Sequence, residues 1–211
     1  MLVRMTREAS SPAVRDGGDA AERVLAALER VAVAAAADLL LRPAATRAQL
    51  DAVEQHLGRR LPPDVTAFYL LHDGQEVDAR RRGAHGLVAG LALLPLEEVL
   101  RQWDQWASLD LGPDADEPAG SEPEGFVRSR CWLPGWVPLT HDGSGNHVGL
   151  DLDPDALGTA GQLITFGADD DLHRVLAPSL VDHLERVPSL VTDLELAADE
   201  ISQLLGPHAG P

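Results

Sequence analysis

The apolar positions between residues 20 and 41 are three or four residues apart, which predicts an amphipathic helix over this range. They are Val24, Leu28, Val31, Ala35 and Leu39. A second helix is expected from Thr46 to Gly58, because Thr46 and Gln49 have the spacing of a capping box and glycine suits a helix C-terminus. Residues 61–74 predict a short third helix that ends in an Asp-Gly turn.

The pattern then changes. Residues 86–94 form an apolar run that predicts a strand ending at Pro95, and residues 96–107 return to helical spacing. Residues 108–130 are rich in proline, glycine and acidic side chains, which indicates a long loop.

The following segment is rich in predicted strands. Residues 132–139 form one, placed at an edge or a bulge by Pro134 and Pro138. After a turn at 141–146, further strands are expected at 147–152 and 162–166, and then a helix at 178–187. Pro188 is expected to interrupt that helix, and a last amphipathic helix carries its apolar stripe at Val191, Leu194, Ala198, Ile201 and Leu205.

This order predicts an α+β fold, a mostly antiparallel sheet with helices packed around it, flanked by an extra N-terminal and an extra C-terminal helix. We expect residues 1–19 to be a flexible tail and residues 20–188 to form the domain. Residues 189–211 are expected to be a C-terminal amphipathic helix and tail. The terminal helices could also pair between two copies and give a homodimer.

Charge restricts the choice of partner. Acidic residues outnumber basic ones by 34 to 17, so the formal net charge is −17. Such a field repels nucleic acids and anionic membranes and attracts a basic protein, although high negative charge also simply keeps a protein soluble. The N-terminus lacks the apolar stretch of a signal peptide, and no run of about 18 apolar residues occurs, which predicts a cytoplasmic protein.

The densest polar motif is the turn at 141–146. Asp142, Ser144, Asn146 and Asp153 have positions 1, 3, 5 and 12 of a calcium-binding EF-hand loop, but His147 stands where that loop needs glycine. His141 and His147 could face each other as a zinc pair, yet two ligands are too few, and we expect surface histidines. Turn formation alone also explains the Asp-Gly and Gly-Asn dipeptides.

Few features of the sequence indicate catalysis. Asp169, Asp170 and Asp171 could take part in acid/base chemistry or hold magnesium, but an acidic turn before a helix is also typical of a solvated cap. The only cysteine, Cys131, lies in an apolar run and suits a core position better than a nucleophile. We find no nucleophile elbow and no phosphate-binding glycine loop, and we expect no enzyme, metal or cofactor. A metal-dependent hydrolase using Asp142, Asp151 and Asp153, or the triple-aspartate turn, is the weaker alternative.

Several motifs together resemble the SUKH superfamily, in the branch named for the fungal cell-wall assembly regulator. They are Leu61-Pro62-Pro63-Asp64, Phe68-Tyr69 and His72-Asp73-Gly74; Leu93-Leu94-Pro95-Leu96 with Trp103; Trp136-Val137-Pro138-Leu139; Asp142-Gly143 with Gly145-Asn146; Asp151-Leu152-Asp153-Pro154; and Gly161-Gln162-Leu163-Ile164 with Phe166. The resemblance covers about residues 46–187. It implies the α+β fold above and architectural roles for the shared residues Pro62, Gly74, Trp103, Trp136, Pro138, Asp142, Gly143, Gly145, Asn146, Asp151, Pro154 and Gly161.

The resemblance also implies a non-catalytic protein-binding module. Bacterial members of the superfamily are often immunity proteins, so our leading hypothesis is an immunity protein that neutralises a basic, nuclease-type toxin. The alternative is a regulatory adaptor in cell-wall or secretion machinery. The acidic positions expected to contact a basic partner are Asp114, Asp116, Glu117, Glu122, Glu124, Asp169, Asp170 and Asp171. Trp106 or Trp136, if exposed, would be the aromatic anchor.

Overall fold

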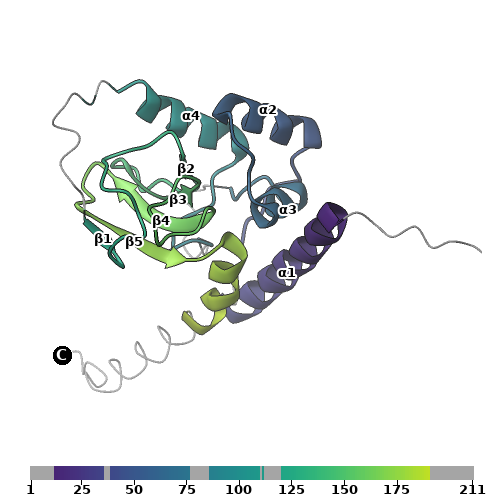
Figure 1. The fold of residues 1–211 in the computed structure, drawn as a ribbon. Helices are drawn as coiled ribbons and strands as arrows, with labels where there is room; N and C mark the ends of the chain where they lie inside the picture. The colour runs from purple at the N-terminus through teal and green to yellow at the C-terminus, as the bar shows by residue number, and fades with distance from the viewer. Residues whose placement is uncertain (1–11, 36–38, 77–85, 110, 112–119, 191–211) are drawn as a thin grey trace, which may run out of the picture.

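The computed structural model describes residues 12–35, 39–76, 86–109, 111 and 120–190. Its labelled elements, in chain order, are α1 (Pro12–Ala35), α2 (Arg47–Leu57), α3 (Pro63–Leu71), α4 (Leu96–Ala107), β1 (Gly120–Glu122), β2 (Trp136–Pro138), β3 (Asn146–Asp151), β4 (Gln162–Gly167) and β5 (Leu172–Ala177). A further helix covers 180–190. The predicted α+β fold with a mostly antiparallel sheet is confirmed (Figure 1).

The sheet has five strands in the order β1-β5-β4-β3-β2. The pairs β2–β3, β3–β4 and β4–β5 are antiparallel, whereas β1 pairs with β5 in parallel. The hairpin β3–β4 is the longest pairing and runs from Asn146 opposite Gly167 to Asp151 opposite Gln162. Asn146 starts β3 and Gly167 ends β4, so the turn before β3 and the turn after β4 lie at the same end of the sheet.

The two faces of the sheet are covered by different parts of the chain. Residues 148, 150 and 163 belong to the main core, which includes Val24, Leu28 and Val31 of α1, Phe68 and Tyr69 of α3, and residues 181, 184 and 187 of the last helix. On the other face, Trp136, Ile164 and Phe166 form a second cluster with Val127. The alternation of side chains along each strand produces this division.

The N-terminal helix is part of the packed domain. It starts at Pro12 and ends at Ala35, whereas the sequence predicts residues 20–41, so residues 12–19 of the predicted tail lie within α1. Arg23 donates to Asp182 at 2.8 Å and to Glu185 at 2.9 Å, which joins α1 to the helix that follows β5 (Figure 1). The apolar face of α1 that carries Val24, Leu28 and Val31 is thus covered within the same chain.

Helix ends follow local chemistry closely. The predicted capping box is confirmed: the Thr46 side chain accepts from the Gln49 amide, and the Gln49 side chain accepts from the Thr46 amide. Gly58 ends α2 in the left-handed conformation, as expected. The predicted interruption at Pro188 is wrong, since the helix extends to residue 190. The predicted helix beyond it lies outside the described residues.

Three strand predictions need correction. Residues 86–94 do not form a strand: Ala89 and Gly90 have positive φ and make a tight turn closed by a Val88–Leu91 bridge. The run is apolar because its residues on either side of this turn belong to the core. Strand β1 lies within the predicted loop, and β5 lies between the acidic turn and the last helix, where the sequence predicts no strand.

Candidate functional site

The turn before β3 uses its aspartate to hold itself together. The Asp142 carboxylate accepts from the Ser144 amide and hydroxyl, both at 2.7 Å, and from the Asn146 amide at 3.0 Å and side-chain nitrogen at 2.8 Å. Burial pushes the pKa of Asp142 up, but these hydrogen bonds outweigh it and place that pKa well below its ordinary value. Asp142 is therefore a fixed negative charge at neutral pH.

Asn146 joins this turn to the turn between β4 and β5. Its side-chain oxygen accepts from the Asp169 amide at 3.0 Å, and its side-chain nitrogen lies 3.3 Å from the Asp169 carboxylate. A Cβ on Gly167 would lie 2.5 Å from the Asn146 Cα, so the close approach of the two turns requires glycine there. Two acidic turns that are remote in sequence become one surface.

A hollow of about 280 Å³ lies at this junction, and we call it the acidic hollow. Its polar lining includes Asp142, Asn146, Asp169, Asp170 and Arg174, and its apolar lining includes Leu91 and Val148. Leu91 comes from the tight turn that replaces the predicted strand. No pattern in the sequence indicates that this segment lies beside the two acidic turns.

Exposed acids continue beyond the hollow. Asp171 follows Asp170 and is exposed, and Glu122 of β1 lies opposite Arg174 of β5, with 3.3 Å between their charged groups. We call Glu122, Asp142, Asp169, Asp170 and Asp171 the acidic end. Glu124 is exposed as well. The other predicted contact residues, Asp114, Asp116 and Glu117, lie outside the described residues.

The predicted aromatic anchors are not at the surface. Trp136 is 0% exposed and packs on Phe166, and Trp106 is 8% exposed. The exposure on which the anchor role depends is therefore not met in this structure, because both side chains are buried in the core. Trp103 and Trp132 are the half-buried tryptophans, and they meet edge to face with ring centroids 5.8 Å apart. They lie in α4 and in the segment before β2.

His141 and His147 do lie together, as the zinc-pair hypothesis supposed, but His147 is buried rather than at the surface. Its ring stacks on His141 at 5.1 Å, accepts a hydrogen bond from Trp106 Nε1 at 2.9 Å, and lies 2.7 Å from the Thr140 carbonyl. A nitrogen that accepts from tryptophan carries no proton, so these contacts fix the neutral ring with its proton on Nδ1. Burial lowers the pKa of His147.

The geometry does not assemble the spacing that resembles a calcium loop. Strand β3 separates Asp142 from Asp153, and Asp153 instead lies 3.1 Å from Arg128. Asp151 is buried, which raises its pKa, and its carboxylate accepts from the Gln162 side chain and the Asp153 amide, both at 3.0 Å. Within the described part of the chain, no three His, Cys, Asp or Glu side chains are grouped to hold a metal ion.

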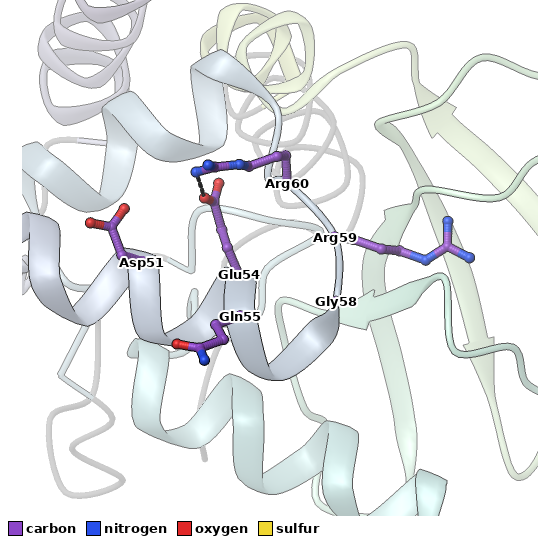
Figure 2. A pocket seen from close by; sticks show the side chains of 6 residues that line it. All are labelled: Asp51, Glu54, Gln55, Gly58, Arg59 and Arg60. Carbon is purple, nitrogen blue, oxygen red and sulfur yellow. Dashed lines mark hydrogen bonds and ion pairs between the residues drawn. The ribbon is translucent and has the colours of Figure 1, made fainter.

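A second hollow, of about 430 Å³, lies at the C-terminal end of α2 (Figure 2). Its charged side chains are largely used within the protein. Glu54 pairs with Arg60 and accepts from the Leu61 amide at 2.9 Å. Figure 2 shows Arg59 pointing toward the sheet, where it donates to the Leu152 carbonyl at 3.2 Å. These contacts support the junction of α2 with the sheet and leave the acidic hollow as the better candidate.

Comparison with known families agrees with the motifs. The model of the SMI1 / KNR4 family (SUKH-1) matches residues 44–186. The chain belongs to this family. The matched range coincides closely with the predicted 46–187. It starts after α1, although α1 is packed into the same core.

Curated relatives are fungal regulators. A cell wall biosynthesis/cell cycle regulator of Schizosaccharomyces pombe is 33% identical over 180 residues, which cover 79% of this chain and 35% of the relative. A cell wall assembly regulator of Saccharomyces cerevisiae is 28% identical over 180 residues, covering 71% of this chain and 35% of the relative. A glucan synthesis regulatory protein of Neurospora crassa is 28% identical over 173 residues, covering 65% and 32%.

The chain thus spans about a third of the length of these relatives. These relatives are named as regulators, which agrees with the predicted regulatory alternative. None of the helices among the described residues is long and apolar enough to cross a membrane.

Proposed function

We propose that this protein is a non-catalytic regulatory module that binds another protein through its acidic end. Support comes from family membership, from relatives named as regulators, and from the convergence of two acidic turns at one end of the sheet. The last observation carries the proposal. The carboxylates of Asp142, Asp169 and Asp170 are held there by Asn146 and by backbone amides, so these side chains lose little conformational freedom when a partner binds.

The partner favoured by this surface is a basic protein segment. Complementary charge raises association rates from about 10⁵–10⁶ toward 10⁸–10⁹ M⁻¹s⁻¹ at low salt. The overall charge of −17 acts in the same direction. Nucleic acids are negatively charged and would be repelled by this acidic surface, so they are not proposed as partners.

Among regulatory roles, we favour an adaptor in cell-wall or secretion machinery, because the relatives are named for cell-wall and glucan-synthesis regulation. An immunity protein for a basic toxin is the second candidate, and the acidic end is the observation that favours it. A nuclease toxin needs a basic surface for its substrate, which would complement this end.

Affinity purification from the native cells tests the proposal. The wild type is compared with Asp169→Asn/Asp170→Asn/Asp171→Asn, which removes three charges with little change of shape. A matched variant, Glu22→Gln/Glu29→Gln/Glu97→Gln, removes three exposed charges elsewhere. We expect one stoichiometric basic partner with wild type and control, and at least a tenfold loss with the aspartate variant. Equal recovery with all three proteins would refute the acidic end as the binding surface.

The identity of the recovered partner separates the two roles. A component of envelope or secretion machinery supports the adaptor. A toxic domain whose activity stops on complex formation supports the immunity protein.

A further inference from the structure

The last turn of α4 is fastened to the sheet by a hydrogen bond from a tryptophan to a histidine. Val99, in the first half of the helix, lies in the main core. At the other end, Trp106 is 8% exposed, whereas its two chain neighbours are exposed. Trp106 Nε1 donates to Nε2 of His147 in β3 at 2.9 Å, and the two ring centroids lie 6.1 Å apart. This contact requires a free lone pair at Nε2 of His147.

A second proton on His147 is incompatible with this contact. Nδ1 of the ring lies 2.7 Å from the Thr140 carbonyl and carries the proton of the neutral form. A further proton enters at Nε2, where it faces the indole N–H, so that two donors would stand 2.9 Å apart. The positive charge would also form on a residue that is 3% exposed. Protonation of His147 therefore requires the indole to move away.

The acidic hollow gives protons access to His147, because this histidine is part of its lining. The charged groups around the stacked histidines come from the turn before β3, the hollow and α4, and they are Asp142, Asp169, Asp170, Arg174, Glu98 and Arg101. The carboxylates favour a charged His147 ring, whereas burial, Arg174 and a charged His141 disfavour it. Burial has the largest effect and lowers the pKa of His147 in the closed structure. A ring released into water regains the ordinary histidine pKa of about 6.5.

We propose that His147 and Trp106 form an acid-sensitive latch, in which a proton at Nε2 of His147 displaces the indole and frees the last turn of α4. Histidine suits this role because its charge changes near physiological pH. Release exposes the Trp106 ring, so the aromatic anchor that is buried in the closed structure becomes available to a partner only after acidification. The latch does not depend on the acidic end as a docking surface.

The size of the effect follows from the difference in pKa between the closed and open forms. If protonated His147 occurs only in the open form, the equilibrium constant for opening rises by at most about 30-fold between pH 7.5 and pH 5.0. The measurement is hydrogen exchange of the Trp106 indole proton in the ¹⁵N-labelled full chain, relative to N-acetyltryptophanamide at the same pH. The indole signal is assigned from its absence in Trp106→Phe. We expect its protection to fall by about five- to 30-fold over this pH range.

The variant His147→Gln separates protonation of this residue from other effects of pH. The glutamine side-chain oxygen accepts from the indole and does not titrate, so protection should change by less than about twofold. His56→Gln is the matched control. His56 Nε2 lies 2.6 Å from the Asp104 carboxylate, so it is another histidine contact of α4, and its side chain is 43% exposed. This variant should keep the acid-induced loss of protection at Trp106.

A second measurement uses the wild type alone. Imidazole ¹⁵N spectra should show His147 neutral with its proton on Nδ1 at pH 7.5, and its protonation should coincide with the loss of indole protection. Three results would overturn the proposal: a proton on Nε2 of His147 at pH 7.5, an equal loss of indole protection in the wild type and His147→Gln, or an equal loss at the amides of β3 and β4. The last of these is global unfolding rather than release of α4.

Discussion

Leu28→Ala in α1 tests whether the helix that precedes the family match belongs to the folded domain. Leu28 is 4% exposed and lies in the main core with residues of α3 and the last helix. Truncating a buried leucine costs about 2–5 kcal/mol, and the tight packing here favours about 3 kcal/mol. For a domain of this size, that corresponds to a melting temperature lower by roughly 6–12 °C.

The assay is equilibrium unfolding in urea, followed by tryptophan fluorescence, with Leu25→Ala as the matched control. Leu25 is in the same helix and is 46% exposed, so its truncation should change stability by no more than about 0.5 kcal/mol. If the two variants have equal unfolding free energies, or if both match the wild type, α1 does not pack as described. A lower urea slope in Leu28→Ala alone would also contradict cooperative unfolding of α1 with the sheet.

Three further predictions follow from the site and its support. Burial lowers the pKa of His147 in the folded state. Below the ordinary histidine pKa of about 6.5, the unfolded chain therefore binds more protons at this residue than the folded chain does. The free energy of unfolding then falls as pH decreases, by at most about 1.4 kcal/mol per pH unit from this residue. His147→Gln should be less stable than wild type at pH 7.5, and urea titrations should show this gap narrowing by pH 5.5; a constant gap would contradict the assigned neutral state. Gly74→Ala should lower the free energy of unfolding by about 2–4 kcal/mol or prevent folding, because the φ of Gly74 is +74° and a Cβ there would lie 2.6 Å from a backbone carbon. Gly58→Ala, where a Cβ would meet open space, should lower it by about 1 kcal/mol. Thermal melts that rank the two variants the other way would refute this prediction. Asn146→Ala should lower the melting temperature and increase amide hydrogen exchange in both acidic turns, and protection unchanged in the turn after β4 would show that Asn146 does not join them.

Local chemistry made part of this structure predictable. The capping box at Thr46 and the C-terminal Gly58 involve residues a few positions apart, so their spacing already contains the contact. The turn at Asp142 is equally local, since the four hydrogen bonds that the Asp142 carboxylate accepts all come from residues no more than four positions away. Such features form between residues close in sequence and therefore do not depend on the tertiary arrangement.

The remaining features depend on contacts remote in sequence. Strand β1 has three residues and exists because β5 pairs with it, so no periodicity could reveal it. The apolar run at 86–94 resembles a strand because its side chains are buried, but positive φ at Ala89 and Gly90 turns the chain back. Composition cannot tell which tryptophan is exposed. Trp136 is buried because the loop before β2 covers that face of the sheet.

The acidic hollow combines both cases. The turn at Asp142 and the run Asp169–Asp171 are both visible in the sequence, and each is a candidate functional site from the sequence alone. Their junction through Asn146 and the addition of Leu91 require the register of β3 with β4 and the tight turn. Sequence alone therefore named most of the carboxylates of the site but did not place them together.

Hydrogen exchange of the purified complex with its native partner tests the docking surface most directly. Binding at the acidic end should slow exchange by at least tenfold in the segments 141–147 and 167–174, with little change in α2 and α4. Protection confined to α2 and α4, with both turns exchanging as in the free protein, would contradict the account.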